Sequence, residues 1–388
     1  MKPALKTLLF AAPLLLFSGR IEASSNEKST QAPAAVISPY TYWCTTPGNC
    51  HPERGRFYNP AGVKVGNNYY IYVQGGAYVN VTTGPGSECT AVGEEILLFK
   101  APWTAQGLRS PFTYVKTITP CRTDVPDVHY ELGSVFQSST DGKYKILVDE
   151  TENGASVGNG NFKRILLGSS TDGLTWTWSP FLQQSTVGSV TYSFLESTLV
   201  QATANTNWWG MYLWGTTGSE NLMVGQIRVI QDAMNPRGFV AYLLASDGTW
   251  KPVNDDGTVN FDPKGLWSVF ASDGGSATAI ILNNGAWESW GSLGPGTATA
   301  GCNDGDIYDS TLIYRTVTQT GLPGPLQTVT SSVRPMPTIN SSGRLYPFRL
   351  NDMNGAKLLY SASTDRMCTE GRLSGWKGME VVLTEVDN

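Results

Sequence analysis

The feature that most constrains this chain is a pattern that recurs along it: an apolar segment, a polar turn rich in Gly, Asn or Asp, and an aromatic-rich segment. It occurs at Gly62–Val73, Ser134–Val148, Ser197–Trp214, Ser268–Leu282 and Met336–Leu350. Each copy is typical of a β-hairpin. Anchored at Asn59, Glu131, Glu196, Trp267 and Arg334, the copies follow one another at intervals of 72, 65, 71 and 67 residues. Near-equal intervals predict repeated structural units.

The composition favours an all-β fold. Charged residues make up 15% of the chain and glycine contributes 42 of its 388 residues, so exposed helices should be few and turns many. Each repeat has room for about four strands, and four-stranded units arranged radially form a β-propeller. We therefore predict a five-bladed β-propeller whose ring is closed by Tyr40–Trp43. The alternative is a pair of β-sandwich domains, which would not create a period near 70 residues.

The N-terminal segment has the pattern of a secretory signal. Lys2 and Lys6 precede an apolar run from Leu8 to Phe17, and Ala23 is a small residue suited to cleavage. The sequence therefore predicts a signal peptide at residues 1–23, a disordered polar tail at 24–36 and a single propeller domain at 37–388. We expect a secreted or periplasmic monomer without a membrane span, because ten apolar residues are too few to cross a bilayer.

The charge and the cysteines narrow the class of protein further. The formal net charge is −5, so no basic footprint indicates nucleic-acid binding. An even number of cysteines in an exported chain predicts disulfides, with Cys44–Cys50 the closest pair in sequence. A metal site is the alternative, but the chain lacks a Cys-x-x-Cys pair and has only the histidines His51 and His129.

The propeller hypothesis brings distant residues together. The innermost strand of each blade lines the central channel, so polar residues near the starts of these strands should converge at one mouth. They are His51, Glu53, Arg54, Arg56, Asp127, His129, Glu131, Glu196 and Arg334. An ordinary location in solvated loops is the alternative for the two histidines.

Several short motifs stand out within the repeats. Asn59-Pro60 is followed by Gly66-Asn67-Asn68-Tyr69-Tyr70, and later segments are Asp141-Gly142-Lys143-Tyr144 and Ser170–Trp176. These motifs resemble those of the five-bladed propeller glycoside hydrolases, the family 43 arabinofuranosidases and xylosidases and their furanosidase relatives. The first is similar to their first-blade motif, in which the dipeptide is Asp-Pro, the second to a turn of a later blade, and the third to their Ser-x-Asp-Gly-x-x-Trp element. The segment Leu195–Val200 resembles the third-blade strand that carries the family's general acid. Sialidases are disfavoured, because their box needs a residue between Asp and Gly, and Asp172-Gly173 has none.

The resemblance implies a pair of carboxylates that flank a glycosidic bond. Glu196 matches the general acid, whose pKa must be raised by burial or by a third carboxylate. Asn59 stands where the family has its general-base Asp, and an amide cannot take a proton from water. A substitute base would be Glu131, Asp127 or Glu53, although Glu131 is out of the expected register for the second-blade Asp that modulates the acid's pKa.

Two hypotheses of different class remain open. The first is a secreted glycoside hydrolase acting on furanose or xylose-type residues of a polysaccharide, with Glu196, Glu131 and Asp127 as catalytic residues. The residues expected to bind substrate are Asn59, His51, Arg56, His129 and Arg334. The second is a non-catalytic propeller that binds a glycan or a surface partner at the same mouth. We expect no cofactor; a calcium ion at Asp304, Asp306 and Asp309 is a weaker alternative to a solvated loop.

Overall fold

The fold consists of β-strands joined by turns. The computed structural model describes residues 35–37, 56–76, 92–102, 113–119, 128–152, 160–201, 207–218, 223–265, 275–283, 286–293, 311–317, 324–325, 327–328, 341–352, 355–364 and 379–386. No helix occurs among these residues, which confirms the all-β prediction. Nor does any of them belong to an apolar helix of the length needed to cross a membrane. All the described residues lie within one compact unit, Pro33–Asn388.

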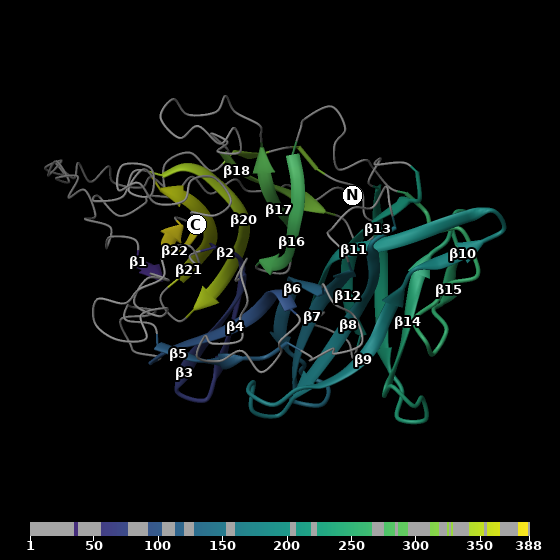
Figure 1. Ribbon diagram of the computed structural model, residues 1–388, viewed down its shortest axis with the longest axis horizontal. Helices are drawn as coiled ribbons and strands as arrows, with labels where there is room; N and C mark the ends of the chain where they lie inside the picture. Colours follow the sequence, from purple (N-terminus) through teal and green to yellow (C-terminus); the bar gives the residue numbers. More distant parts are fainter. Residues whose placement is uncertain are drawn as a thin grey trace, which may run out of the picture. The chain divides into compact units, whose positions relative to one another are not determined.

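The strands fall into five units, each built around four strands, and blade 3 has two short strands besides. Figure 1 labels most of them. Blade 1 contains β2 (Arg56–Val65), β3 (Asn68–Gly76), β4 (Val92–Pro102) and β5 (Thr113–Thr117). Blade 2 contains β6 (Val128–Gln137), β7 (Tyr144–Glu152), β8 (Phe162–Ser170) and β9 (Thr177–Gln183). Blade 3 contains β11 (Val190–Gln201), β12 (Asn207–Thr216), β13 (Met223–Gln231) and β14 (Phe239–Leu244), flanked by β10 (Ser185–Val187) and β15 (Trp250–Pro252).

Two further units complete the set. Blade 4 contains β16 (Gly275–Asn283), β17 (Ala286–Leu293), β18 (Thr311–Val317) and β19 (Gln327–Thr328). Blade 5 contains β20 (Ser341–Asp352), β21 (Gly355–Thr364) and β22 (Met379–Val386), and β1 (Ala35–Ile37) pairs with β22 as its outermost strand. Blades 1 and 2 are joined into one sheet only by a short parallel contact of β4 with β6.

The first strands of the five blades contact one another in a closed order. β2 contacts β6, β6 contacts β11, β11 contacts β16, β16 contacts β20, and β20 contacts β2. Such a cycle of innermost strands is the arrangement of a five-bladed β-propeller. The closing strand differs from the prediction: it is β1 at Ala35–Ile37, which straddles the expected boundary after residue 36, whereas Tyr40–Trp43 lies outside the described residues.

A β-bulge interrupts the pairing of the first strand in every blade. The bulges lie at residues 59–60, 133–134, 196–197, 278 and 346–347. Bulges bend a strand and redirect its side chains, and they are frequent beside active sites. The bulge is therefore a feature that repeats once per blade. Two of the bulges coincide with the sequence anchors Asn59 and Glu196.

One of the five predicted hairpins is wrong in position. Met336–Leu350 was expected to contain a turn, but β20 is a continuous strand that pairs with β21. In blade 4, β16 pairs with β17, and residues 268–274 of the predicted hairpin lie outside the described residues. The sequence offers two turn signals in each blade, and the later one separates the paired strands: Asn283-Asn284-Gly285 in blade 4 and Asp352–Gly355 in blade 5. The first three predicted hairpins correspond to β2–β3, β6–β7 and β11–β12.

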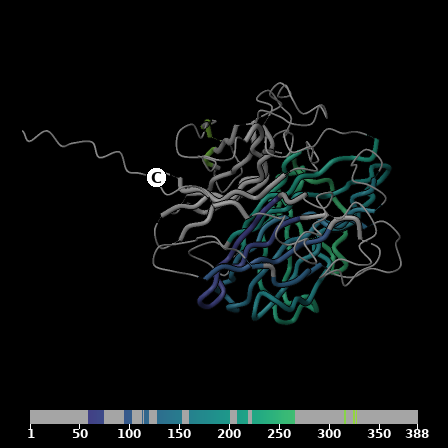
Figure 2. Tube along the Cα trace, turned by 60° about the vertical axis from the view of Figure 1, so that its left-hand side comes forward, coloured from purple at the N-terminus to yellow at the C-terminus, as the bar shows by residue number. Residues whose placement is uncertain are grey.

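Side chains of β7 alternate between two hydrophobic cores. Ile146 and Val148 pack in a cluster with blade 1, whereas Leu147 packs in a cluster with blade 3. Figure 2 traces these blades from another side. Because side chains of a strand alternate in direction, Asp149 and Lys145 are expected on the same side of β7 as Leu147, toward blade 3. This placement brings polar groups of blade 2 against the first strand of blade 3.

Candidate functional site

The candidate site is built on the bulge of β11. Glu196 is the first residue of this bulge and has a backbone φ of 46°. This is the left-handed region, which residues other than Gly, Asn and Asp rarely adopt. Among the described residues other than glycine, only Asn59 shares this conformation, with a φ of 50°. A non-glycine residue held in this region costs about 1–3 kcal/mol, and such strain concentrates at functional sites.

Asp149 of blade 2 holds the Glu196 bulge in place. Its Oδ2 accepts a hydrogen bond from the backbone N–H of Glu196, and the N–H of Ser197 also bonds to its carboxyl group. The side chain is 1% exposed, and its Oδ1 is buried without a hydrogen-bond partner. A buried carboxyl group with a free oxygen is costly unless it is protonated or meets a ligand. Asp149 was not anticipated from the sequence.

Glu150, the next residue on β7, shows how a buried carboxylate with a structural role is neutralised. Glu150 is fully buried, and its two oxygens accept hydrogen bonds from Nε and Nη2 of Arg164 at 2.9 and 3.0 Å. A two-point pair with arginine neutralises a buried carboxylate. Among the described residues, Asp149 has no such partner. The charged group that acts on its pKa is another carboxylate, that of Glu196, and this arrangement favours retention of a proton.

Burial raises the pKa of Glu196 to about 7. Burial is also the main reason why the pKa of Asp149 lies well above its ordinary value; the charge of Glu196 adds to this, while the two backbone N–H groups oppose it. Glu196 nevertheless keeps part of its side chain exposed. A carboxyl group that is protonated near neutral pH and reachable from solvent can act as a general acid.

The two bulges of blades 2 and 3 lie against each other because Gly133 has no side chain. A Cβ at this position would lie 2.2 Å from the carbonyl oxygen of Ser197. Beside this contact, Oγ of Ser134 accepts a hydrogen bond from the N–H of Leu199 at 2.9 Å and donates one to its carbonyl oxygen at 3.3 Å. The close contact of Gly133 with Ser197 and the hydrogen bonds of the Ser134 hydroxyl together fix the position of β11 against β6.

Asn59 occupies the matching bulge of blade 1, where it joins blades 1 and 2. Its Nδ2 donates hydrogen bonds to the carbonyl oxygen of Leu132 and, at 3.4 Å, to Oε1 of Gln74. The same Gln74 oxygen accepts the N–H of Leu132 at 3.3 Å. The amide nitrogen is thus committed to an inter-blade clamp made by Asn59, Gln74 and Leu132.

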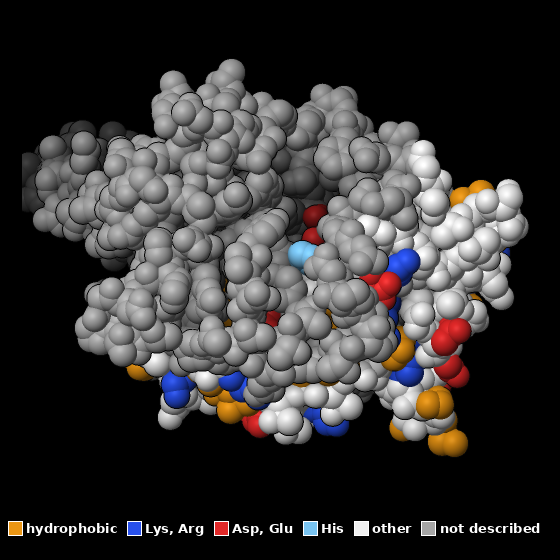
Figure 3. Space-filling model, in the orientation of Figure 1, with side chains coloured by type: hydrophobic (Ala, Val, Ile, Leu, Met, Phe, Trp, Pro, Cys, Tyr) orange, Lys and Arg blue, Asp and Glu red, His pale blue; other side chains and the backbone are white. Residues whose placement is uncertain are grey.

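Glu131 and His129 lie on the blade 3 side of β6. Their neighbours Tyr130 and Leu132 pack toward blade 1, while Glu131 and His129 remain partly exposed. Glu131 is directly opposite Asp149 in the β6–β7 pairing, which places their Cβ atoms about 5 Å apart. Figure 3 shows acidic side chains and a histidine close together in the middle of one face. Glu131 lies two residues before the blade 2 bulge, so Gly133, not Glu131, is the counterpart of Asn59 and Glu196.

The structure brings together part of the predicted site. Glu196, Glu131 and His129 come from adjacent blades at the ends where the bulges lie, and Asn59 lies in the neighbouring bulge. Arg56 belongs to β2, but its side chain is not among those described. Outside the described residues lie His51, Glu53, Arg54, Asp127, Arg334, the three aspartates of the possible calcium loop and all six cysteines. Among the described residues, no group of three or more His, Cys, Asp or Glu side chains could hold a metal ion.

Comparisons with known proteins were made at the level of sequence and of structure. No family model matches the chain, and a search of curated protein sequences finds no match. Similar solved structures include an endo-arabinanase of glycoside hydrolase family 43 from Bacillus licheniformis, at 13% identity and a TM-score of 0.46, covering 84% of this chain and 93% of that one. An α-L-arabinofuranosidase from Lactobacillus brevis is 12% identical with a TM-score of 0.48, covering 86% and 90%.

A sialidase from Trypanosoma rangeli is also similar, at 11% identity and a TM-score of 0.46, and the match covers 92% of this chain but 57% of the sialidase. The fold assignment itself rests on the strand order and the cyclic contacts described above.

Proposed function

We propose that this protein is a secreted carbohydrate-active hydrolase in which Glu196 donates a proton to the leaving oxygen of a glycosidic bond. One observation carries the proposal: a partly exposed glutamate in a strained bulge, with a pKa of about 7, held by a second buried carboxyl group. A glutamate with a purely structural role would need neither a strained backbone conformation nor a second carboxyl group, that of Asp149, beside it.

Asp149 acts in this proposal as a positioning residue. It anchors the backbone N–H of Glu196, and thereby fixes the direction in which the Glu196 side chain leaves the bulge. Since burial raises the pKa of Asp149 and so favours its neutral form, the pair of carboxyl groups can hold a proton near the substrate oxygen. The proton that is transferred in the first step is the one on Glu196.

The water molecule requires a separate base. Glu131 is the described candidate, because it is partly exposed, lies on the blade 3 side of β6 and is opposite Asp149. Asp127 is the other candidate named from the sequence. An inverting hydrolase needs about 6.5–9.5 Å between the acid and the base, so that water fits between the base and the sugar.

We propose furanose or xylose-type residues of a polysaccharide as the substrate class. The support is the resemblance of Asn59–Tyr70 and Leu195–Val200 to the motifs of the family 43 propellers. The endo-arabinanase and the arabinofuranosidase named above act on sugars of this class, as their names state. Export is supported by the signal-like segment at residues 1–23.

A panel of aryl α-L-arabinofuranosides and β-D-xylosides, assayed with the wild type and Glu196→Gln at pH 6, tests the proposal. We expect measurable hydrolysis by the wild type and a loss of about 10³-fold or more in the variant, which keeps the shape of the side chain but has no acidic proton to give. Glu152→Gln is a matched control at the end of β7, and we expect it to retain activity. Undiminished hydrolysis by Glu196→Gln would remove Glu196 from the role of acid.

A non-catalytic glycan-binding propeller is the second candidate. The observation that favours it is the commitment of the Asn59 amide to Leu132 and Gln74, at the position where the resembling family has a base. If no glycoside of the panel is hydrolysed while arabinan or xylan oligosaccharides bind, this alternative is the better description.

A further inference from the structure

A second polar pocket lies between blades 2 and 3, at the opposite end of β7 from Asp149. Its volume is about 770 Å³, within the range of pockets that bind small molecules. Lys145 lines it and is four residues from Asp149 along β7, a distance of about 13 Å in an extended strand. The pocket is therefore separate from the candidate site described above.

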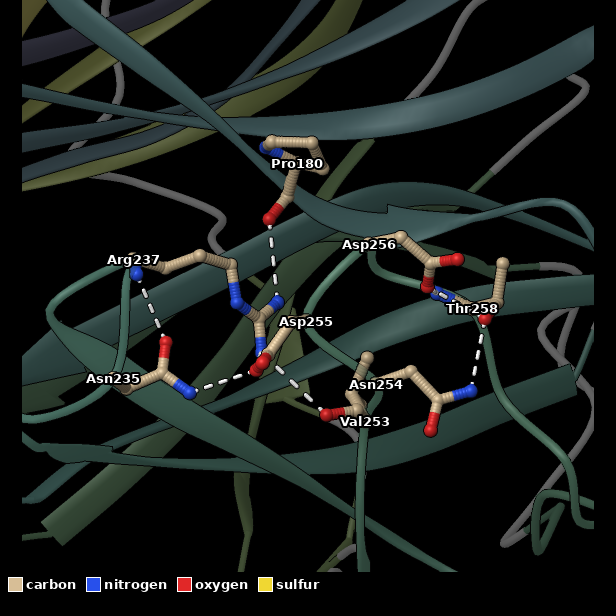
Figure 4. A network of polar contacts seen from close by, with 8 residues as sticks. All are labelled: Pro180, Asn235, Arg237, Val253, Asn254, Asp255, Asp256 and Thr258. Carbon is tan, nitrogen blue, oxygen red and sulfur yellow. Dashed lines mark hydrogen bonds and ion pairs between the residues drawn. The ribbon is translucent and has the colours of Figure 1, made fainter.

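Arg237 supplies the first unusual feature of this pocket. Its side chain is 5% exposed, and its Nε is buried without a hydrogen-bond partner. The other contacts are long: Nη1 to the carbonyl oxygen of Pro180 at 3.4 Å and Nη2 to that of Val253 at 3.5 Å (Figure 4). The nearest carboxylate oxygen, on the largely exposed Asp255, is 3.7 Å from Nη2. The guanidinium also lies over the ring of Phe239, with its Cζ 4.8 Å from the ring centroid. A buried guanidinium whose hydrogen bonds and ion pair are this long is able to accept a further anionic partner.

Lys145 of β7 supplies a second cation among the lining residues. Its side chain is 7% exposed, its Nζ donates hydrogen bonds to Asp141 at 2.8 Å and to Ser169 at 3.0 Å, and it lies over the ring of Trp208. An ammonium group has three protons to donate, so one remains after these two contacts. With the exposed Lys143, the lining side chains carry three positive charges against the one of Asp141.

Hydroxyl groups make up much of the remaining wall. Thr175 and Thr177, both exposed, line the pocket together with Ser169 and Ser179. Hydroxyls that face solvent can donate to and accept from the hydroxyls of a sugar, while the cations select for negative charge. The pocket thus combines one anion-binding element with a hydroxyl-rich wall.

We propose that this pocket binds an acidic sugar unit, with its carboxylate at Arg237 and Lys145 and its hydroxyls at Thr175 and Thr177. The choice of a sugar over another small hydroxylated anion rests on the proposed function. The site would let the protein hold the acidic side groups of a polysaccharide while the other end of blades 2 and 3 meets the glycosidic bond.

Isothermal titration calorimetry with glucuronate, glucose, acetate and inorganic phosphate tests this proposal. We expect glucuronate to bind at least tenfold more tightly than glucose, acetate or phosphate, and Arg237→Met to weaken it at least tenfold. Lys100→Ala, which removes an exposed charge from β4 of blade 1 outside this pocket, is the matched control and should change the affinity less than threefold. The same affinity should persist in Glu196→Gln, so that a failure of the hydrolase proposal is distinguished from a failure of this one.

The double variant Thr175→Val/Thr177→Val provides a second test that leaves the buried cations in place, and it decides the question if Arg237→Met does not fold. It should weaken glucuronate about three- to tenfold and leave acetate unchanged. Tighter binding of phosphate or acetate than of glucuronate would identify a simple anion site and overturn the sugar assignment. Unchanged glucuronate affinity in the threonine variant, or in a folded Arg237→Met, would place the sugar elsewhere.

Discussion

The backbone N–H of Glu196 in blade 3 donates a hydrogen bond to Oδ2 of Asp149 in blade 2. This single bond links the strained bulge of β11 to a carboxyl group buried within the neighbouring sheet. It explains why Glu196 can hold a positive φ, since the bulge is fixed from the adjacent blade. It also places the carboxyl group of Glu196 close enough to raise the pKa of Asp149.

The rate of hydrolysis should depend on the protonation of Glu196. Since burial raises the pKa of Glu196 to about 7, a general acid at this position is protonated below that pH and loses its proton above it. We expect kcat/KM to fall tenfold per pH unit on the alkaline side, with an apparent pKa near 7. A rate that stays level up to pH 9 would contradict the role of Glu196 as acid.

The stability difference between the wild type and Glu196→Gln should change with pH. The folded-state pKa of Glu196 is raised, so the folded protein binds this proton more tightly than the unfolded chain, and the wild type loses stability as the pH rises from about 4.5 to about 7. Glutamine has no such titration. We expect the variant to gain about 1–3 kcal/mol relative to the wild type between pH 4 and pH 8, measured by denaturant unfolding. An unchanged difference would mean that the carboxyl group is hydrated in the folded state.

Substitutions of Asp149 should separate its shape from its charge. Alanine removes the acceptor of the Glu196 N–H and leaves a buried donor unsatisfied, so we expect Asp149→Ala to lose about 2–3 kcal/mol of unfolding free energy. Asparagine keeps an acceptor oxygen, and because burial favours the neutral form of Asp149, Asp149→Asn should cost less than about 1 kcal/mol. Equal losses in the two variants would show that Asp149 is ionised in the folded protein.

Asn59→Asp should not create a more active enzyme. The substitution replaces the donor Nδ2 by an oxygen facing the carbonyl oxygen of Leu132 and Oε1 of Gln74. Repulsion between these acceptors should lower stability by about 2–3 kcal/mol and leave hydrolysis no faster than in the wild type. Melting temperature and kcat/KM measured together check this expectation; a clear gain in kcat/KM would mean that position 59 can serve as the base.

Gly133→Ala should damage both stability and activity. A Cβ at this position meets the carbonyl oxygen of Ser197 at 2.2 Å, so either blade 3 is displaced or the β11 bulge changes shape. We expect a loss of about 3 kcal/mol or more. Gly66→Ala is the matched control, because its Cβ would meet nothing within 4 Å and only its φ of 58° opposes a side chain, at a cost of about 1 kcal/mol. If Gly133→Ala and Gly66→Ala lost the same stability and the same activity, the contact between the two bulges would be unimportant.

The sequence predicted the strand repeats because each blade carries its own local signals. Alternating apolar residues and the turn residues Gly66-Asn67 and Asp141-Gly142 are read directly from neighbouring positions. The hairpin of blade 5 was misplaced where two turn signals compete, since local patterns do not determine which of them lies between paired strands. The prediction that the blades form a ring depended only on the near-equal intervals between the repeats.

Asp149 was missed for a different reason. It follows the apolar run Ile146–Val148 in a strand whose two faces are both buried, so periodicity does not mark it as functional. The only available signal was a lone aspartate at the end of a buried apolar run. Its importance depends on the bulge at Glu196, which is 47 residues away along the chain and on the next blade.

The leaving-group dependence of Glu196→Gln tests the central claim most directly. A 2,4-dinitrophenyl glycoside departs without protonation, whereas a 4-methoxyphenyl glycoside needs a proton from the general acid. With Glu196 as that acid, kcat/KM of the variant should fall less than about tenfold on the first substrate and about 10³-fold on the second. Equal losses on both substrates would contradict proton donation by Glu196.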